Sequence, residues 1–265
     1  MELLNYYLEV AIQSAIEAGA YLLNRFGEDH SPIYKSEFDV GLLADKDSEK
    51  IILRKILNEF PSHNIYSEEI GGIKNQSDFT WYIDPLDGTN NYYAGIPYFG
   101  VSIALVKNSK PIVGVVYNPI TDQLFTAIKG GGAFLNNKKI RQRVENKTSH
   151  AVLSFIRGHS KDGASAFDVQ AKEIEDILSE KFSRVLKMWA PSLDWCLLAL
   201  GKIDLLISYE SELEDMFAGL LIAQESGYKV YNFSGVQYRP GNYRIFVSKK
   251  ELINDLIQLL NPFSK

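Results

Sequence analysis

Two aspartates set three positions apart carry the clearest chemical signal in the chain. Asp84 and Asp87 follow the apolar run Trp81–Ile83, which predicts a short buried strand. Pro85 is expected to end that strand directly after Asp84, because proline fixes φ and cannot extend a ladder. The strand end would then aim two carboxylates and the Leu86 carbonyl at one point. Hard oxygen ligands grouped in this way are typical of a site for Mg²⁺ or Mn²⁺.

The residues that follow add a second kind of binding group. Gly88 and Thr89 are predicted to begin a short helix, and N–H groups at a helix start bind anions such as phosphate. A solvated acidic turn is the alternative for a bare pair of aspartates. The complete string D-P-L-D-G-T-N-N is much less degenerate than such a pair, so the segment predicts a cation site beside an anion site.

Composition and charge set the broad class of protein. A chain of 265 residues with 46% hydrophobic and 23% charged residues can build one large domain or two tightly joined ones around a real core. The formal charge of −5, without a basic stripe, excludes a nucleic-acid footprint. Cys196 is the only cysteine and lies among apolar neighbours, so it is predicted to be a core residue of a protein in a reducing compartment. The N-terminus has no signal region, and no apolar run approaches the roughly 20 residues of a membrane span. We therefore expect a cytoplasmic protein with neither membrane nor nucleic acid as a partner.

Hydrophobic periodicity predicts the elements that must position these residues. An amphipathic helix is expected from Leu4 to Leu22, closed by Gly27, and a second helix from Ser48 to Glu59. A β-rich antiparallel meander and then alternating strands and helices should follow. The meander strands are expected at 101–107, 111–117 and 123–128; the later strands at 151–156, 184–188 and 203–208; and the later helices at 167–178, 191–200 and 215–226. This order predicts an α/β (α+β) fold with two sheets.

The string from Asp84 to Asn91 resembles the signature of the inositol monophosphatase family, within the Mg²⁺-dependent, lithium-sensitive sugar phosphatases. Further segments resemble landmarks of that family in the expected order. They are Ala44–Asp47, Ser67–Glu69, Gly130–Asn136 and Asp215–Gly219. The resemblance covers the chain from about Lys35 to Gly227. It implies the layered αβαβα sugar-phosphatase fold, with an N-terminal half (1–145) carrying most metal ligands and a C-terminal half (146–265) carrying Asp215 and substrate contacts.

The resemblance also implies roles for individual residues. A first Mg²⁺ would bind Glu68, Asp84 and the Leu86 carbonyl, and a second would bind Asp84, Asp87 and Asp215. Thr89, polarised by Asp45, would orient the attacking water, with Glu68 sharing the role of general base. The implied substrate contacts are Asp87, Gly88, Thr89 and Asp215. Two or three Mg²⁺ ions are expected, with Mn²⁺ as an alternative and Li⁺ as an inhibitor.

The convergence of carboxylates that the resemblance implies would itself require a metal at this position. Two like charges 4 Å apart repel by about 4 kcal/mol at an effective dielectric of 20, so converging carboxylates need a counter-ion. No histidine has a ligand-like spacing, which favours Mg²⁺ over zinc. The four histidines, predicted to be surface or capping residues, are His30, His63, His150 and His159.

The chain departs from the family pattern where the substrate should bind. Glu214 stands where many members have tryptophan, and the segment Trp189–Ser192 replaces a G-S/T-x-A motif. Glu210, Glu212 and Glu214 would either repel a second phosphate or simply face solvent. The role of Lys35, which resembles a family lysine with shifted spacing, stays open. Asp47 and Glu69 beside predicted ligands are expected either to support those ligands or to be solvated.

These observations predict a Mg²⁺-dependent phosphomonoesterase acting on a small polyol phosphate such as inositol 1-phosphate. A homodimer is expected, because family members are commonly dimers. Fructose-1,6-bisphosphatase or a dual activity is the first alternative, and a 3′-phosphoadenosine 5′-phosphate phosphatase, for which no adenine-binding signal is present, is the second. A non-catalytic interaction scaffold is the third. Loss of a metal ligand would favour the scaffold, but all five carboxylates and Thr89 are present.

Overall fold

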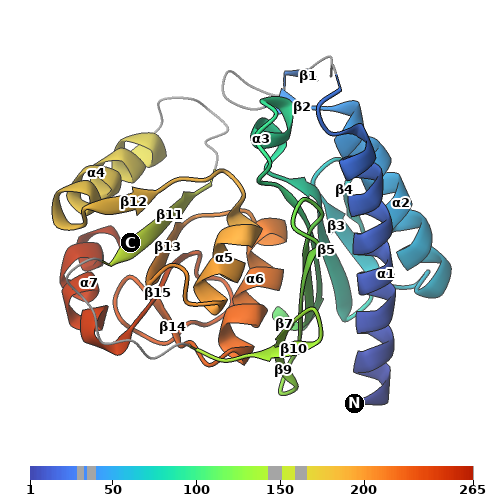
Figure 1. Ribbon diagram of the computed structural model, residues 1–265. Coiled ribbons are helices and arrows are strands. Elements are labelled where there is room, and N and C mark those ends of the chain that lie inside the picture. The colour runs from blue at the N-terminus through green and yellow to red at the C-terminus, as the bar shows by residue number, and fades with distance from the viewer. Residues whose placement is uncertain (29–32, 35–39, 143–150, 159–165, 265) are drawn as a thin grey trace.

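The computed structural model describes residues 1–28, 33–34, 40–142, 151–158 and 166–264. Figure 1 shows five layers in which helices alternate with two large sheets. The helices are α1 (Glu2–Arg25), α2 (Leu43–Glu59), α3 (Thr89–Tyr93), α4 (Ala166–Lys181), α5 (Pro191–Ala199), α6 (Leu213–Glu225) and α7 (Ile253–Leu260), with 3-10 turns η1 (Lys250–Leu252) and η2 (Asn261–Phe263). Helices α1 and α2 form one outer layer, α5 and α6 the central layer, and α4 and α7 the other outer layer. The predicted αβαβα fold is confirmed.

The larger sheet has eight strands in the order β10-β9-β8-β7-β6-β5-β3-β4. Its strands are β3 (Asn64–Ser67), β4 (Gly71–Ile73), β5 (Phe79–Asp87), β6 (Gly100–Lys107), β7 (Lys110–Asn118), β8 (Gln123–Ile128), β9 (Gly132–Leu135) and β10 (Lys138–Ile140). Strands β5 to β10 pair antiparallel in sequence order, which confirms the predicted meander, whereas β3 and β5 are parallel.

The smaller sheet has five strands in the order β12-β11-β13-β15-β14. Its strands are β11 (Val152–Arg157), β12 (Arg184–Leu186), β13 (Leu205–Tyr209), β14 (Val230–Asn232) and β15 (Arg244–Ser248). Two further short strands, β1 (Ile33–Tyr34) and β2 (Val40–Gly41), pair with each other. The predicted boundary between two halves, after residue 145, lies outside the described residues.

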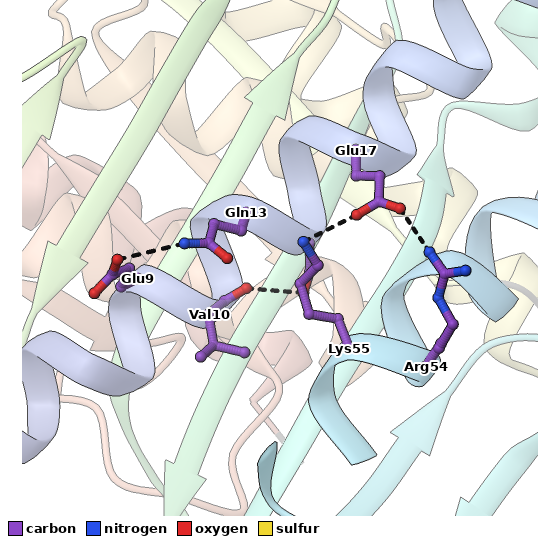
Figure 2. A network of polar contacts seen from close by, with 7 residues as sticks. Glu9, Val10, Gln13, Glu17, Arg54 and Lys55 are labelled. Carbon is purple, nitrogen blue, oxygen red and sulfur yellow. Dashed lines mark hydrogen bonds and ion pairs between the residues drawn. The ribbon is translucent and has the colours of Figure 1, made fainter. Parts of the chain in front are cut away.

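Three apolar cores fill the spaces between the layers. One joins α1 and α2 to the larger sheet, a second surrounds α5 and α6, and a third lies under α4 and α7. The α1 stripe follows the predicted period, since Ala11, Ala15, Ala18 and Leu22 are fully buried. Figure 2 shows the exposed side of the α1–α2 pair, where Glu17 accepts from Arg54 at 2.8 Å and from Lys55 at 2.9 Å. Among the described helices, none is long and apolar enough to cross a membrane.

Close approach of the central helices to their neighbours depends on small residues in α6. A Cβ on Gly219 would lie 2.3 Å from the Cβ of Trp195 in α5. A Cβ on Gly114 in β7 would lie 2.9 Å from the backbone oxygen of Ala218. The Ala218-Gly219 pair therefore lets α6 pack closely against both a helix and a sheet. This packing positions the first turn of α6, which carries Asp215.

One prediction about the signature segment is wrong. Strand β5 does not end at Asp84 but continues to Asp87. The ladder with β6 pairs Asp84 with Ser102 and Asp87 with Gly100, so Pro85 and Leu86 share one opposite position. Proline is tolerated in such an irregularity, because no ladder hydrogen bond is required of its nitrogen. The second helix also begins five residues earlier than predicted, at Leu43.

Candidate metal centre

Three carboxylates meet where β5 ends and α6 begins. Asp84, Asp87 and Asp215 each offer an oxygen, and these three oxygens lie within 4.8 Å of one another. Asp84 and Asp87 are buried, and Asp215 is half-buried. Helix α3, which follows β5 after one residue, lies at the top of the larger sheet in Figure 1. The triad joins Asp84 to Asp215, which lies 131 positions later in the chain (215 − 84).

Local hydrogen bonds fix the turn that carries the first two aspartates. The Leu86 N–H donates to Asp84 Oδ1 at 2.9 Å, and the Ser48 hydroxyl from α2 donates to the Pro85 carbonyl at 2.7 Å. The Thr89 hydroxyl lies 3.0 Å from the Leu86 carbonyl oxygen. A carbonyl oxygen has two lone pairs, so the Leu86 carbonyl keeps one for a cation.

Gly88 allows the chain to turn from β5 into α3. Its φ of +92° is in the left-handed region that side chains disfavour. A Cβ at this position would also lie 3.1 Å from the Tyr98 carbonyl oxygen and 3.2 Å from the Cβ of Ala190. Both the backbone conformation and the surrounding space therefore require glycine between Asp87 and Thr89.

Helix α5 holds Asp87 from the opposite side. The Ser192 N–H donates to Asp87 Oδ2 at 2.9 Å, and the Ser192 hydroxyl donates to the same oxygen. Burial nevertheless raises the pKa of Asp87 to about 8, and the charge of Asp194 adds to this rise. Asp194 is buried too, where it accepts from Tyr98 and Ser154.

The other two members of the triad are electrostatically unfavourable as ionised groups. Burial, followed by the charges of Glu68, Asp215 and Asp87, raises the pKa of Asp84 well above its ordinary value. Burial also raises the pKa of Asp215 strongly, with Asp87 as the next cause. Among the described ion pairs, none joins a lysine or arginine to these three aspartates. A hard divalent cation would supply the missing charge, and the all-oxygen donor set fits Mg²⁺ or Mn²⁺.

Glu68 lies beside this triad on a loop organised by a buried acid. Its side chain is exposed, yet its charge is the second cause of the raised pKa of Asp84. Glu49 from α2 accepts the Ser67 hydroxyl and, at 3.2 Å each, the N–H groups of Glu69 and Ile70. Glu49 thus fixes the turn on which Glu68 stands.

Asp45 and Thr89 form the pair that the sequence predicts. The Thr89 hydroxyl lies 3.0 Å from Asp45 Oδ1, and Asp45 is fully buried. The N–H of Leu42 donates to the other oxygen of Asp45, as in half of a capping box. A threonine hydroxyl that donates to a carboxylate keeps lone pairs with which to accept a hydrogen bond from water.

Several predicted residues lie elsewhere or differ from expectation. Asp47 accepts from Tyr21 at 2.9 Å and from Lys50 at 2.8 Å, so it faces α1 and solvent. Lys35 falls outside the described residues. The segment Gly130–Asn136 lies at the opposite end of the larger sheet from α3 (Figure 1), where the N–H groups of Gly130 and Gly132 donate to Glu225 of α6. This landmark is a structural turn.

The three glutamates before Asp215 do not simply face solvent. Glu214 is buried, and burial raises its pKa to about 7, with the charges of Glu212 and Glu68 adding to the rise. Glu210 accepts from Arg244 Nε at 2.7 Å, so its charge is compensated. Glu212 is half-buried. Glu214 therefore places a buried acid beside the centre.

His63 also differs from expectation, since it is neither a surface nor a capping residue. It is buried, stacks between Phe60 and Phe79, and accepts from the Trp81 indole at 3.1 Å. The other three histidines lie outside the described residues.

Sequence reasoning missed the side chains that hold the site residues in place. Ser192 was noted only as part of a divergent motif, and Ser48 and Glu49 were not identified. One signal was available, because the spacing of four between Asp45 and Glu49 puts both acids on one face of α2. Nothing local indicates that Ser192 would meet Asp87, which is 105 positions away.

Comparison with known proteins agrees with this architecture. A layered αβαβα fold with an acidic triad between its two sheets is the arrangement of metal-dependent sugar phosphatases. Residues 3–262 match the inositol monophosphatase family, and the chain belongs to that family. It is 35% identical to the fructose-1,6-bisphosphatase/inositol-1-monophosphatase of Aquifex aeolicus, over 99% of this chain and 98% of the relative. It is 32% identical to the Nus factor SuhB of Pasteurella multocida, over 98% and 97% of the two chains. The solved inositol monophosphatase of Anabaena superimposes with a TM-score of 0.81 at 30% identity, covering 98% of this chain and 96% of that one.

Proposed function

We propose that this protein is a Mg²⁺-dependent phosphomonoesterase that hydrolyses a small polyol phosphate, with inositol 1-phosphate as its best substrate. The observation that carries the proposal is the triad Asp84, Asp87 and Asp215, whose oxygens converge without a cationic side chain in the described ion pairs. Family membership supports phosphatase chemistry. We further propose that the enzyme is a cytoplasmic homodimer.

In this proposal, two cations divide the acidic residues between them. Glu68, Asp84 and the Leu86 carbonyl would hold one, and Asp84, Asp87 and Asp215 would hold the other. When bound, the cations would lower the pKa of water and neutralise charge on the phosphate and on the leaving oxygen. The other contacts to substrate are the backbone N–H groups of Gly88 and Thr89, which lie next to the phosphate.

Asp45, Thr89 and Glu68 prepare the attacking water. The Thr89 hydroxyl donates a hydrogen bond to Asp45, so that the Thr89 oxygen can accept a hydrogen bond from water and fix its direction. Glu68 is the exposed carboxylate beside the triad, and it shares the role of general base with the Asp45–Thr89 pair by taking up the water proton. The hydroxide so formed attacks phosphorus as the P–O ester bond breaks, and the leaving alkoxide takes up a proton from solvent water, so no phosphorylated protein forms.

The test is phosphate release from a panel of sugar and polyol phosphates, with and without Mg²⁺. We expect hydrolysis that EDTA abolishes and that added Mg²⁺ restores. Activity that survives thorough chelation would contradict the two-cation mechanism. Absence of hydrolysis of every ester, by a folded protein, would favour a non-catalytic scaffold, a reading that the name of the SuhB relative raises.

A second candidate function is hydrolysis of fructose 1,6-bisphosphate. The Aquifex aeolicus relative carries both activities in its name. In addition, a cationic side chain, Arg244, pairs with Glu210, which lies a few positions before Asp215 in the sequence. Arg244 is already paired with Glu210, whereas Glu214 is a buried acid next to Asp215. The local charge therefore disfavours a second phosphate, and kcat/KM should be higher for inositol 1-phosphate. The reverse order at saturating Mg²⁺ would put fructose bisphosphatase first.

A further inference from the structure

Trp189 combines an unfavourable backbone conformation with unusual exposure. Its φ is +54°, in the left-handed region that bulky residues rarely adopt. Its side chain is 64% exposed, whereas Trp81 and Trp195 are completely buried. The indole therefore gains little stabilisation from burial in this position, although its backbone adopts an unfavourable conformation. Strain of this kind is retained in proteins mainly at functional sites.

Contacts on both sides fix Trp189 against the segment that carries the metal triad. The Asn91 side-chain amide donates to the Met188 carbonyl at 2.7 Å and to the Tyr98 carbonyl at 2.8 Å. On the other side, Ala190 is fully buried and its Cβ lies 3.2 Å from the position of a Cβ on Gly88. Two residues further on, Ser192 donates to Asp87.

These anchors place the backbone of Trp189 beside the segment that carries Asp87 and Gly88. Neighbouring Cα atoms are about 3.8 Å apart, so Trp189 starts within one residue of the Gly88 contact and of the Asn91 contact. Gly88 and Asp87 belong to the proposed phosphate and cation sites. The alcohol part of a phosphate ester bound there would extend away from the buried aspartates, and the exposed Trp189 side chain belongs to the residue next to Ala190, which contacts Gly88.

We propose that the indole of Trp189 forms a wall against which the carbon skeleton of the substrate packs. This inference rests on the proposed phosphatase function and names a residue that sets its preference among phosphate esters. A ring presents a broad face of C–H groups that can cover an aromatic surface, and a short flexible chain does not. Trp189 is thus a specificity-determining residue that selects cyclic over acyclic esters.

The test compares inositol 1-phosphate with glycerol 2-phosphate in Trp189→Gly and Trp189→Phe. Trp189→Gly should lower kcat/KM for the cyclic ester about tenfold, mainly through KM, and change the acyclic ester less than about twofold. Trp189→Phe keeps a ring and should retain most of the selectivity. Because glycine adopts positive φ readily, Trp189→Gly should unfold at the same or a higher temperature, so its loss cannot be a folding defect.

A measurement without turnover tests the same wall. Trp189 is the exposed one of three tryptophans, so acrylamide should quench its emission selectively. Inositol with inorganic phosphate and Mg²⁺ should protect it, and Trp189→Phe should abolish the quenching and the protection. Hydrolysis with equal losses for both esters, or quenching unchanged at inhibitory ligand concentrations, would overturn the wall while leaving the phosphatase function standing. Absence of all hydrolysis would overturn both.

Discussion

Asp84 shows how the charge of one residue can oppose folding and still support function. It is buried among carboxylates, and its pKa is raised well above the ordinary range. The ionised form that a cation requires is therefore unfavourable until the cation binds. Asp47, two positions after Asp45, has the opposite environment, because Lys50 and Tyr21 lower its pKa.

Substitution of these two residues separates a proposed ligand from its neighbour. Asp84→Asn removes a charge from both proposed cation sites and should lower kcat by about a thousandfold or more. The same change should raise the unfolding temperature of the metal-free protein, because a buried carboxyl with a raised pKa costs folding free energy at neutral pH and an amide does not titrate. Asp47→Asn breaks only exposed contacts, worth about 1 kcal/mol or less, and should leave kcat nearly unchanged. Phosphate release and thermal melts in EDTA measure both effects, and similar kcat losses in the two variants would contradict this placement.

His63 should make stability depend on pH. Burial lowers its pKa in the folded state, whereas the unfolded value is about 6.5. As pH falls below about 6.5 the unfolded chain binds the proton first, so the free energy of unfolding declines toward acid pH. Above that pH the contribution is fully present. Buried acids such as Asp194 and Glu214, whose pKa values are raised, act in the opposite direction.

The variant His63→Gln isolates this contribution, since glutamine still offers Trp81 an acceptor. Urea unfolding at pH 7.5 and pH 5.5 should show a smaller loss of stability on acidification in the variant than in the wild type. Parallel losses would mean that His63 titrates alike in the folded and unfolded states.

At the scale of elements, close packing of α5 on α6 supports both sides of the centre. Helix α5 presents Ser192 to Asp87, and the first turn of α6 carries Asp215. Gly219 lies where the helices touch, and an added Cβ would overlap Trp195. The helix interface therefore sets the distance between two of the three aspartates.

Gly219→Ala should test this interface. The overlap with Trp195 should lower the free energy of unfolding by roughly 1–3 kcal/mol and weaken Mg²⁺ binding as α6 shifts. Gly72→Ala is the matched control, because its Cβ would have no neighbour closer than 3.8 Å and its φ is ordinary. Denaturant melts and Mg²⁺ titrations should distinguish the two; equal stability of both variants would show that α5 and α6 adjust without cost.

At the scale of the whole molecule, the two sheets meet at an acidic centre in a chain whose formal charge is already −5. A ligand that binds only the folded state stabilises it by about 2.7 kcal/mol at 100 times its dissociation constant. Mg²⁺ should therefore raise the unfolding temperature, and EDTA should lower it. NaCl at equal ionic strength is the control for screening, and Asp84→Asn should lose most of the shift. An equal response to NaCl would mean that general screening, and not a bound cation, is responsible.

Local patterns in the sequence determined most of the element list and the position of the predicted site. Helix α1, the meander β6–β8 and α6 follow periodicities that need no distant partner, so their existence could be predicted. The signature string and the acidic landmarks pointed to Asp84, Asp87 and Asp215, and the structure brings these three together. Family membership followed from the same residues.

Tertiary structure alone decided which groups surround those residues. Strand β5 continues through Pro85 because β6 accommodates two residues opposite one. Ser192 reaches Asp87 across 105 positions, Glu49 holds the loop of Glu68, and His63 is enclosed by aromatic rings. Such contacts depend on how helices and sheets pack, and packing is set by shape and burial across the whole chain. A short pattern can show that an acid is present, but the fold determines its charge, its partners and its neighbours.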